Sequence, residues 1–199
     1  MKRLFWLAVI ASMPLAARAQ QDTATSLTNH RTKYKTDLYQ IIKDDTAHIS
    51  FYEAAPKYTV TATVQKLKRQ KKFTLLTSSG KKKEARKYAL LSFELDGKSY
   101  QLYAYQLLAL LKKEESASHL FVPFTDDTNI NGSYGGGRYI DLDLKDISGG
   151  KVVLDFNKAY NPYCAFTTGY NCPIPPVENS LNTAIEAGEK YYAAHFAHD

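Results

Sequence analysis

Six residues in the C-terminal half of the sequence have side chains suited to ligand binding or acid–base chemistry. They lie in two short stretches, YGGGRYIDL and DFNKAY, and are Arg138, Tyr139, Asp141, Asp155, Asn157 and Tyr160. The guanidinium of Arg138 can form paired hydrogen bonds with a carboxylate, either on a ligand or inside the protein. The internal candidates are Asp126, Asp141 and Asp155. An internal ion pair is the default interpretation, and a pocket in which Arg138 holds an anionic group is the functional one.

Two functions of different classes follow from these residues. We expect a non-enzymatic binding module for a small polar or anionic ligand, formed by the GGGRY strand, the DFN strand and the loop around the cysteines. The alternative is a hydrolase in which Asp126, Asp141 or Asp155 acts as the base. The sequence contains no GxSxG or HExxH motif, and we expect no cofactor. A scaffold that holds an envelope component is a third interpretation.

Cys164 and Cys172 are the only cysteines in the sequence. In an oxidising compartment they would form a disulfide, which closes a loop of nine residues and stabilises the fold by about 2.6 kcal/mol in the chain-entropy model. A catalytic thiol would need a nearby histidine, and the histidines are scattered at positions 30, 48, 119, 195 and 198. Two cysteines are too few for a zinc site without distant ligands. We therefore predict a disulfide and no metal site.

The glycines and prolines around the six residues shape the backbone. Residues 135–137 are all glycine, and a phosphate loop would place a helix after them, whereas the sequence continues as a strand. We therefore expect a glycine bulge at the edge of a sheet. The segment PIPPVEN after Cys172 should hold a fixed path and form one wall of a groove. Five tyrosines in this region suit stacking on a sugar, or core packing, and are Tyr134, Tyr139, Tyr160, Tyr163 and Tyr170.

The N-terminus has the features of an export signal. Lys2 and Arg3 precede the apolar run LFWLAVIA, and Ala17-Arg18-Ala19 fits the small-x-small cleavage pattern, which places the cut before Gln20. A membrane anchor is the alternative, but the run is shorter than the ~20 residues that span a bilayer. We expect a periplasmic or extracellular protein without a membrane span once residues 1–19 are removed.

Positive charge is concentrated in one segment. Ten Lys or Arg residues and a single acid, Glu84, lie between Lys66 and Lys87, whereas the formal net charge of the whole chain is +6. This segment could attract anionic lipid headgroups, polysaccharide or an acidic partner. Our preferred interpretation is a set of solvated strand ends and turns. Export and the low overall charge argue against nucleic acid as a partner.

Hydrophobic periodicity predicts one β-rich domain over residues 30–199, after a flexible lead-in at 20–29. An apolar stripe predicts a helix over His30 to Lys43. Alternating residues then predict strands at 58–64, 87–95, 119–124, 140–144, 151–156 and 181–187. The Asp96-Gly97 turn predicts a hairpin in which residues 98–106 return as the partner strand of 87–95. LLALLKKEE, residues 107–115, is predicted as a strand that runs into a charged loop, although a helix is an alternative. The expected fold is an antiparallel β-sandwich or barrel of seven to eight strands with an N-terminal helix, in which Ser148-Gly149-Gly150 pairs the GGGRY and DFN strands.

Four segments of this sequence resemble the signature of the bacterial family known as domain of unknown function 1684. They are LFVPFTDDT, YGGGRYIDL, DFNKAYNPYCAF and YNCPIPPVEN, and the resemblance extends from about Phe51 to Tyr192. It implies a family identity without a reaction. The sequence departs from the family pattern before Phe51, where it is shorter, and at Gly132, where members tend to carry an acid. The missing acid argues against an enzymatic role.

Overall fold

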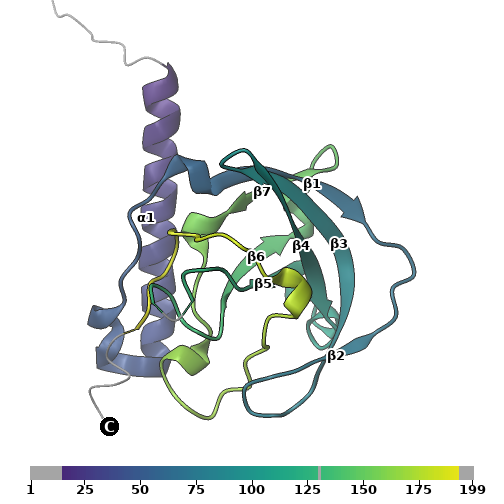
Figure 1. The fold of residues 1–199 in the computed structure, drawn as a ribbon. Coiled ribbons are helices and arrows are strands. Elements are labelled where there is room, and N and C mark those ends of the chain that lie inside the picture. The colour runs from purple at the N-terminus through teal and green to yellow at the C-terminus, as the bar shows by residue number, and fades with distance from the viewer. Residues whose placement is uncertain (1–14, 130, 193–199) are drawn as a thin grey trace, which may run out of the picture.

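The computed structural model describes residues 15–129 and 131–192 and has a mainly β fold, as predicted (Figure 1). The strands are β1 Thr59–Lys66, β2 Phe73–Leu75, β3 Lys83–Leu95, β4 Lys98–Leu107, β5 His119–Phe124, β6 Arg138–Asp143 and β7 Lys151–Asp155. They form one antiparallel sheet in the order β6-β5-β4-β3-β1-β7, with β2 paired to β3. The sheet curls into a half-barrel, and the helix α1, Leu15–Ile42, stands beside it.

Short 3-10 helices connect these elements. They are η1 Lys43–His48, η2 Pro56–Tyr58, η3 Leu110–Lys112, η4 Glu114–Ser116, η5 Leu144–Asp146, η6 Phe156–Lys158, η7 Tyr163–Ala165 and η8 Val177–Asn179. Three of them, η6, η7 and η8, follow β7 and carry the chain back across the barrel. The long C-terminal segment is therefore irregular, although it packs as closely as the strands do.

The period-two patterns correctly identified the buried faces of the strands. Ala89, Leu91, Phe93 and Leu95 of β3 are all buried in the main core. Both residues of the predicted hairpin turn have positive φ, 49° at Asp96 and 74° at Gly97, so the chain reverses within two residues. The β3–β4 hairpin was thus predictable from local sequence.

α1 begins before the predicted start at His30. Residues 20–29, which we expected to form a flexible lead-in, are helical. The face of the helix that carries Leu38 continues backward to Leu27, which is also buried, and Arg31 between them donates a hydrogen bond to the carbonyl of Tyr52 at 3.1 Å. These contacts hold the earlier turns of the helix against the barrel. Residues 1–14 of the predicted export signal lie outside the described residues, and the predicted cut before Gln20 falls in the first turns of α1.

Three predicted strand features differ in the structure. Only Leu107 of LLALLKKEE belongs to a strand, because the segment then turns into η3 and η4. Residues 181–187 bury Leu181, Ile185 and Ala187, but their backbone bonds go to loops and side chains, so they form no strand. β6 and β7 are at opposite ends of the sheet order and do not pair. The short strand β2 was not predicted.

The curvature of the sheet nevertheless brings the segment after β7 back to β6. Tyr139 and Tyr160 form an antiparallel bridge, with backbone hydrogen bonds of 2.9 and 3.0 Å. α1 covers the outside of this junction, where Leu38 packs with Ile49 and Phe166 in a second apolar cluster. The two motif-bearing stretches therefore meet, through this bridge instead of through a hairpin.

Candidate functional site

Arg138 forms the internal ion pair that was its default interpretation. Its side chain has no exposed surface, and Nη2 lies 2.8 Å from Oδ2 of Asp126, which is equally buried. The guanidinium also donates to the carbonyls of Ile185, Ala187 and Glu189. Arg138 thus ties the irregular C-terminal segment to β6, and its charge is directed into the protein interior.

Asp155 and Asn157 brace the end of β7. Oδ1 of Asp155 accepts hydrogen bonds from Thr59 Oγ1 at 3.0 Å and from the backbone N–H of Asn157 at 3.1 Å. The Asn157 amide accepts from the Ala55 N–H and donates to the Ala55 carbonyl. These hydrogen bonds satisfy backbone groups where the chain leaves β7, as polar residues at strand ends commonly do. The structure does not bring either residue to the side chain of Arg138.

The other three predicted site residues, Tyr139, Asp141 and Tyr160, come together at a cavity of about 500 Å³. We call it the tyrosine pocket. Its wall consists of Lys83, Leu107, Leu110, His119, Phe121, Tyr139, Asp141, Tyr160, Pro162, Tyr163, Tyr170, Asn171, Cys172 and Pro173. A smaller cavity of about 290 Å³ lies between this site and α1 and shares Asp141, Tyr160 and Tyr163 with it. Three of the six predicted site residues therefore line a single pocket.

Asp141 is the polar centre of the tyrosine pocket. Its Oδ1 lies 2.8 Å from Nε2 of His119, and its Oδ2 accepts a hydrogen bond of 2.7 Å from the hydroxyl of Tyr160. Burial, reinforced by the Asp141 carboxylate, holds the pKa of Tyr160 well above its usual value. The phenol therefore stays protonated at neutral pH. Asp141 remains partly exposed, so a ligand could also contact its carboxylate.

Aromatic rings form the apolar part of the wall. Tyr139 packs edge-on against Phe121, with ring centroids 4.7 Å apart, and against Tyr160 at 5.7 Å. Tyr163 and Tyr170 make another edge contact at 5.0 Å. Such contacts fix the rings before any ligand arrives. Tyr163 is also among the exposed large hydrophobic residues of the described chain, so its ring is accessible.

Lys83 and His119 are pocket residues that sequence reasoning missed. Lys83 is half-buried at the start of β3, and burial alone lowers the pKa of its ammonium group. Within the described chain, no carboxylate forms an ion pair with it. Lys83 lies in the basic segment from Lys66 to Lys87, which we interpreted as a set of solvated strand ends and turns. A usable signal existed at the start of β3, because Lys83 has the same parity as buried Ala85, before the register shift between Lys87 and Ala89.

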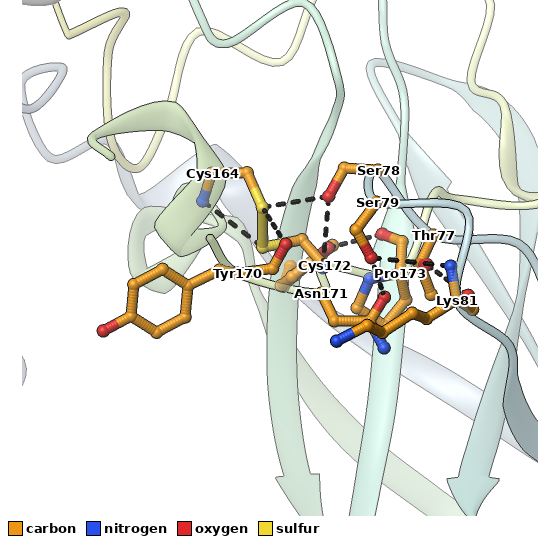
Figure 2. Close-up of a disulfide and its surroundings, with 10 residues drawn as sticks. Thr77, Ser78, Ser79, Lys81, Cys164, Tyr170, Asn171, Cys172 and Pro173 are labelled. Atoms are coloured by element: carbon orange, nitrogen blue, oxygen red, sulfur yellow. Dashed lines mark hydrogen bonds between the residues drawn. A yellow bond between two sulfur atoms is a disulfide. The ribbon is translucent and has the colours of Figure 1, made fainter. Parts of the chain in front are cut away.

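The predicted disulfide is present between Cys164 and Cys172, whose Cα atoms are 6.3 Å apart. It closes the loop that carries Tyr170 and Asn171 (Figure 2). Backbone bonds attach this loop to the β2–β3 turn, from Ser78 N–H to the Cys172 carbonyl and from Ile174 N–H to the Leu76 carbonyl, both 2.9 Å. Since the same turn leads into Lys83, the disulfide loop forms the pocket wall beside this lysine, whereas of the PIPPVEN segment only Pro173 lines the pocket.

The glycine and proline motifs serve this packing. Gly137 has φ of 85°, and a Cβ atom there would lie 2.6 Å from the Phe124 carbonyl oxygen and from the Pro175 ring. The proline-rich segment thus packs directly on the start of β6, where the hydroxyl of Tyr139 donates to the Pro173 carbonyl. At Gly132 a Cβ atom would lie 2.2 Å from the Tyr52 hydroxyl, so an acid there would require the Tyr52 side chain to move. A phosphate loop has no support at these glycines, because a strand follows them.

Within residues 15–129 and 131–192, no three His, Cys, Asp or Glu side chains are grouped so that they could hold a metal ion. His195 and His198 lie outside the described residues. In the same part of the chain, no helix combines the length and apolar character that a bilayer crossing requires.

Comparison with known proteins supports the resemblance seen in the sequence. The family described as "Protein of unknown function (DUF1684)" matches residues 44–190. A similar solved structure is the solution NMR structure of the uncharacterized protein from gene locus rrnAC0354 of Haloarcula marismortui. It is 34% identical, covers 87% of this chain and 96% of its own, and has a TM-score of 0.67. No curated protein matched the sequence.

Proposed function

We propose that this chain, which belongs to the family of proteins of unknown function DUF1684, is a non-enzymatic module that binds a small polar ligand with an anionic group. The observation that carries the proposal is Lys83, a half-buried ammonium without a carboxylate partner on the wall of the tyrosine pocket. A desolvated, unpaired charge is costly, and a bound anion would offset that cost. Lys83 takes the role that the sequence had suggested for Arg138.

The remaining wall suits the polar, uncharged part of such a ligand. The pocket volume of about 500 Å³ is within the usual range for small-molecule sites. Asp141 and His119 offer hydrogen-bonding atoms on one side, and the rings of Tyr163 and Tyr170 offer surfaces for stacking. A hydroxyl-rich ring with a carboxylate or phosphate substituent matches this combination. Sugar acids and sugar phosphates are the chemical class we infer.

A thermal-shift and calorimetry series tests the proposal. The probes are glucuronate, glucose and inorganic phosphate, applied to the wild type, Lys83→Met and Lys82→Met. Lys82 is the exposed neighbour of Lys83 and therefore the matched control. We expect glucuronate to bind more tightly than glucose. Lys83→Met should weaken glucuronate binding by about tenfold to a hundredfold, the value of one hydrogen bond to a charged group.

Two results would contradict the proposal. One is an equal loss of glucuronate binding in Lys82→Met and Lys83→Met, because the effect would then be general electrostatics. The other is an absence of binding for all three probes to a folded wild type, because this would remove the inferred ligand class.

A hydrolase remains the second candidate, and one observation favours it. Of the three acids considered as its base, Asp141 alone lines the pocket, and it is paired with His119. Asp126 is fully buried, and Asp155 supports a turn. Turnover of generic ester, glycoside or phosphate substrates that is lost in Asp141→Asn and kept in Asp155→Asn would favour the hydrolase. Absence of turnover in the wild type would favour binding.

Export is part of the same proposal. The Cys164–Cys172 disulfide supports it, since such bonds persist mainly outside the reducing cytosol. An envelope component is then the natural source of a ligand. Mass spectrometry of the protein after expression of the full sequence should give a chain that begins at Gln20. A cytosolic product that retains Met1 would contradict export.

A further inference from the structure

The edge of the barrel beside the pocket wall exposes aliphatic side chains. Among the described residues, six large hydrophobic side chains are exposed; Leu76 at 69% and Ile174 at 47% lie here, and Val177 at 87% follows Ile174 three residues later in the chain. Leu76 belongs to the β2–β3 turn, and the other two belong to the proline-rich segment. The hydrogen bond from Ile174 N–H to the Leu76 carbonyl joins the two segments. We call Leu76, Ile174 and Val177 the apolar lip.

Unneutralised lysines flank the apolar lip. Leu75 pairs with Lys83 across β2 and β3, so Leu76 and Lys82 are the next residues along the two chains, followed by Lys81. Both lysines are exposed, and neither forms an ion pair with a described carboxylate. The whole basic segment from Lys66 to Lys87 contains ten Lys or Arg residues and only Glu84 as an acid. The lip therefore lies in a region of positive potential.

Two of the ten cations are neutralised within the described chain. Lys72 pairs with Glu84 at 2.7 Å, and Lys87 pairs with Glu178 at 3.0 Å. Lys81 and Lys82, next to Leu76, are not among them. The arrangement thus leaves charge unpaired where the aliphatic side chains are exposed.

We propose that the apolar lip and Lys81 and Lys82 form a docking surface for an anionic lipid bilayer. Aliphatic side chains gain free energy when they enter the boundary between headgroups and acyl chains, while lysines beside them contact lipid phosphates. A polyanionic polysaccharide would bind the lysines but would leave Leu76 and Ile174 in water. A lipid surface satisfies both kinds of side chain in one plane. This inference does not depend on the ligand proposed for the tyrosine pocket.

Vesicle co-sedimentation tests the inference with the protein obtained by expressing the full sequence. The vesicles are phosphatidylcholine alone, and phosphatidylcholine mixed with phosphatidylglycerol. We compare the wild type with a charge variant, Lys81→Gln/Lys82→Gln, and an apolar variant, Leu76→Ser/Ile174→Ser. The matched controls are Lys98→Gln/Lys151→Gln, at exposed lysines away from the lip, and Val153→Ser, at an exposed valine on β7.

We expect the wild type to bind anionic vesicles more tightly than zwitterionic ones. Loss of two lysines should weaken the anionic partition about 30-fold, since each contributes a factor of about five near the surface. The apolar variant should lose about tenfold for each residue that no longer enters the interface. Both control variants should bind as the wild type does.

Three outcomes would overturn the inference. Equal binding to the two kinds of vesicle would mean that the lysines play no part. An equal effect of Lys98→Gln/Lys151→Gln would mean that net charge alone decides binding. A normal affinity of Leu76→Ser/Ile174→Ser, with loss only in the charge variant, would instead indicate a polyanion such as polysaccharide. We expect every variant to fold, because all substituted side chains are exposed, and circular dichroism checks this.

Discussion

The buried pair of Arg138 and Asp126 gives the sharpest test of how this fold is held together. We expect Asp126→Asn to lower the free energy of unfolding by about 3 kcal/mol, at the lower end of the range for breaking a buried ion pair. The guanidinium would lose its counter-charge but keep the carbonyl acceptors of Ile185, Ala187 and Glu189. The shape of the site would be unchanged.

Arg138→Met should cost more, about 5 kcal/mol. It leaves Oδ2 of Asp126 without its cation and removes the donor from all three carbonyls of the C-terminal segment. A loss of this size is a large share of the total stability of a typical domain, about 5 to 15 kcal/mol. The double variant, Asp126→Asn/Arg138→Met, should cost less than the sum, because neither buried charge is then left unpaired.

Urea unfolding followed by circular dichroism measures these differences. Lys87→Met is the control, because the pair of Lys87 with Glu178 is about one-third exposed and should contribute no more than about 1 kcal/mol. If Arg138→Met unfolds at the same urea concentration as Lys87→Met, the internal pair is not structural and the reasoning fails. If it stays folded and loses glucuronate binding, Arg138 belongs to the ligand site after all.

Three further predictions concern other parts of the fold. Burial raises the pKa of Glu189 from 4.5 to about 7, so the folded state favours the protonated form. The free energy of unfolding, measured by urea titration, should therefore fall as pH rises from about 4.5 to 7. Glu189→Gln should make the free energy of unfolding less dependent on pH over this range. Replacing both Cys164 and Cys172 by Ser should lower the free energy of unfolding by about 2.6 kcal/mol, and a reducing agent should leave that variant unchanged but destabilise the wild type. Gly137→Ala should destabilise by more than Gly80→Ala in thermal unfolding, because both have positive φ but only Gly137 faces backbone within 2.6 Å; equal effects would contradict the close approach.

Local sequence patterns predicted the position and buried face of a strand better than they predicted its partner strand. Ala89 to Leu95 show which face of β3 is buried, and Asp96-Gly97 shows where it turns, because both depend on neighbouring residues only. The partner of β7 depends on the whole sheet. We expected a hairpin with β6, but β7 pairs with β1, as in Thr61 with Val153. A period of two identifies a face and carries no information on which strand lies alongside.

The candidate site shows the same division between local and long-range information. The structure brings Tyr139, Asp141 and Tyr160 together, because the motifs that contain them meet at the bridge between β6 and the segment after β7. Asn157 was grouped with them wrongly, because a polar residue after a strand can serve a turn as well as a cleft. Lys83 comes from β3, far away in the sequence, and the strand order β6-β5-β4-β3 brings it to the pocket.

Strand β6 separates structural residues from residues that line the tyrosine pocket within a few positions. Arg138, Ile140 and Leu142 point to the interior, where they hold the C-terminal segment and fill the core. Tyr139 and Asp141 point to the opposite side and line the tyrosine pocket. Because side chains alternate along a strand, a shift of one residue would exchange the two sets. The buried ion pair therefore fixes the register of β6 and, with it, the position of Asp141 beside His119. The residues that stabilise this strand thus also determine the geometry of the pocket.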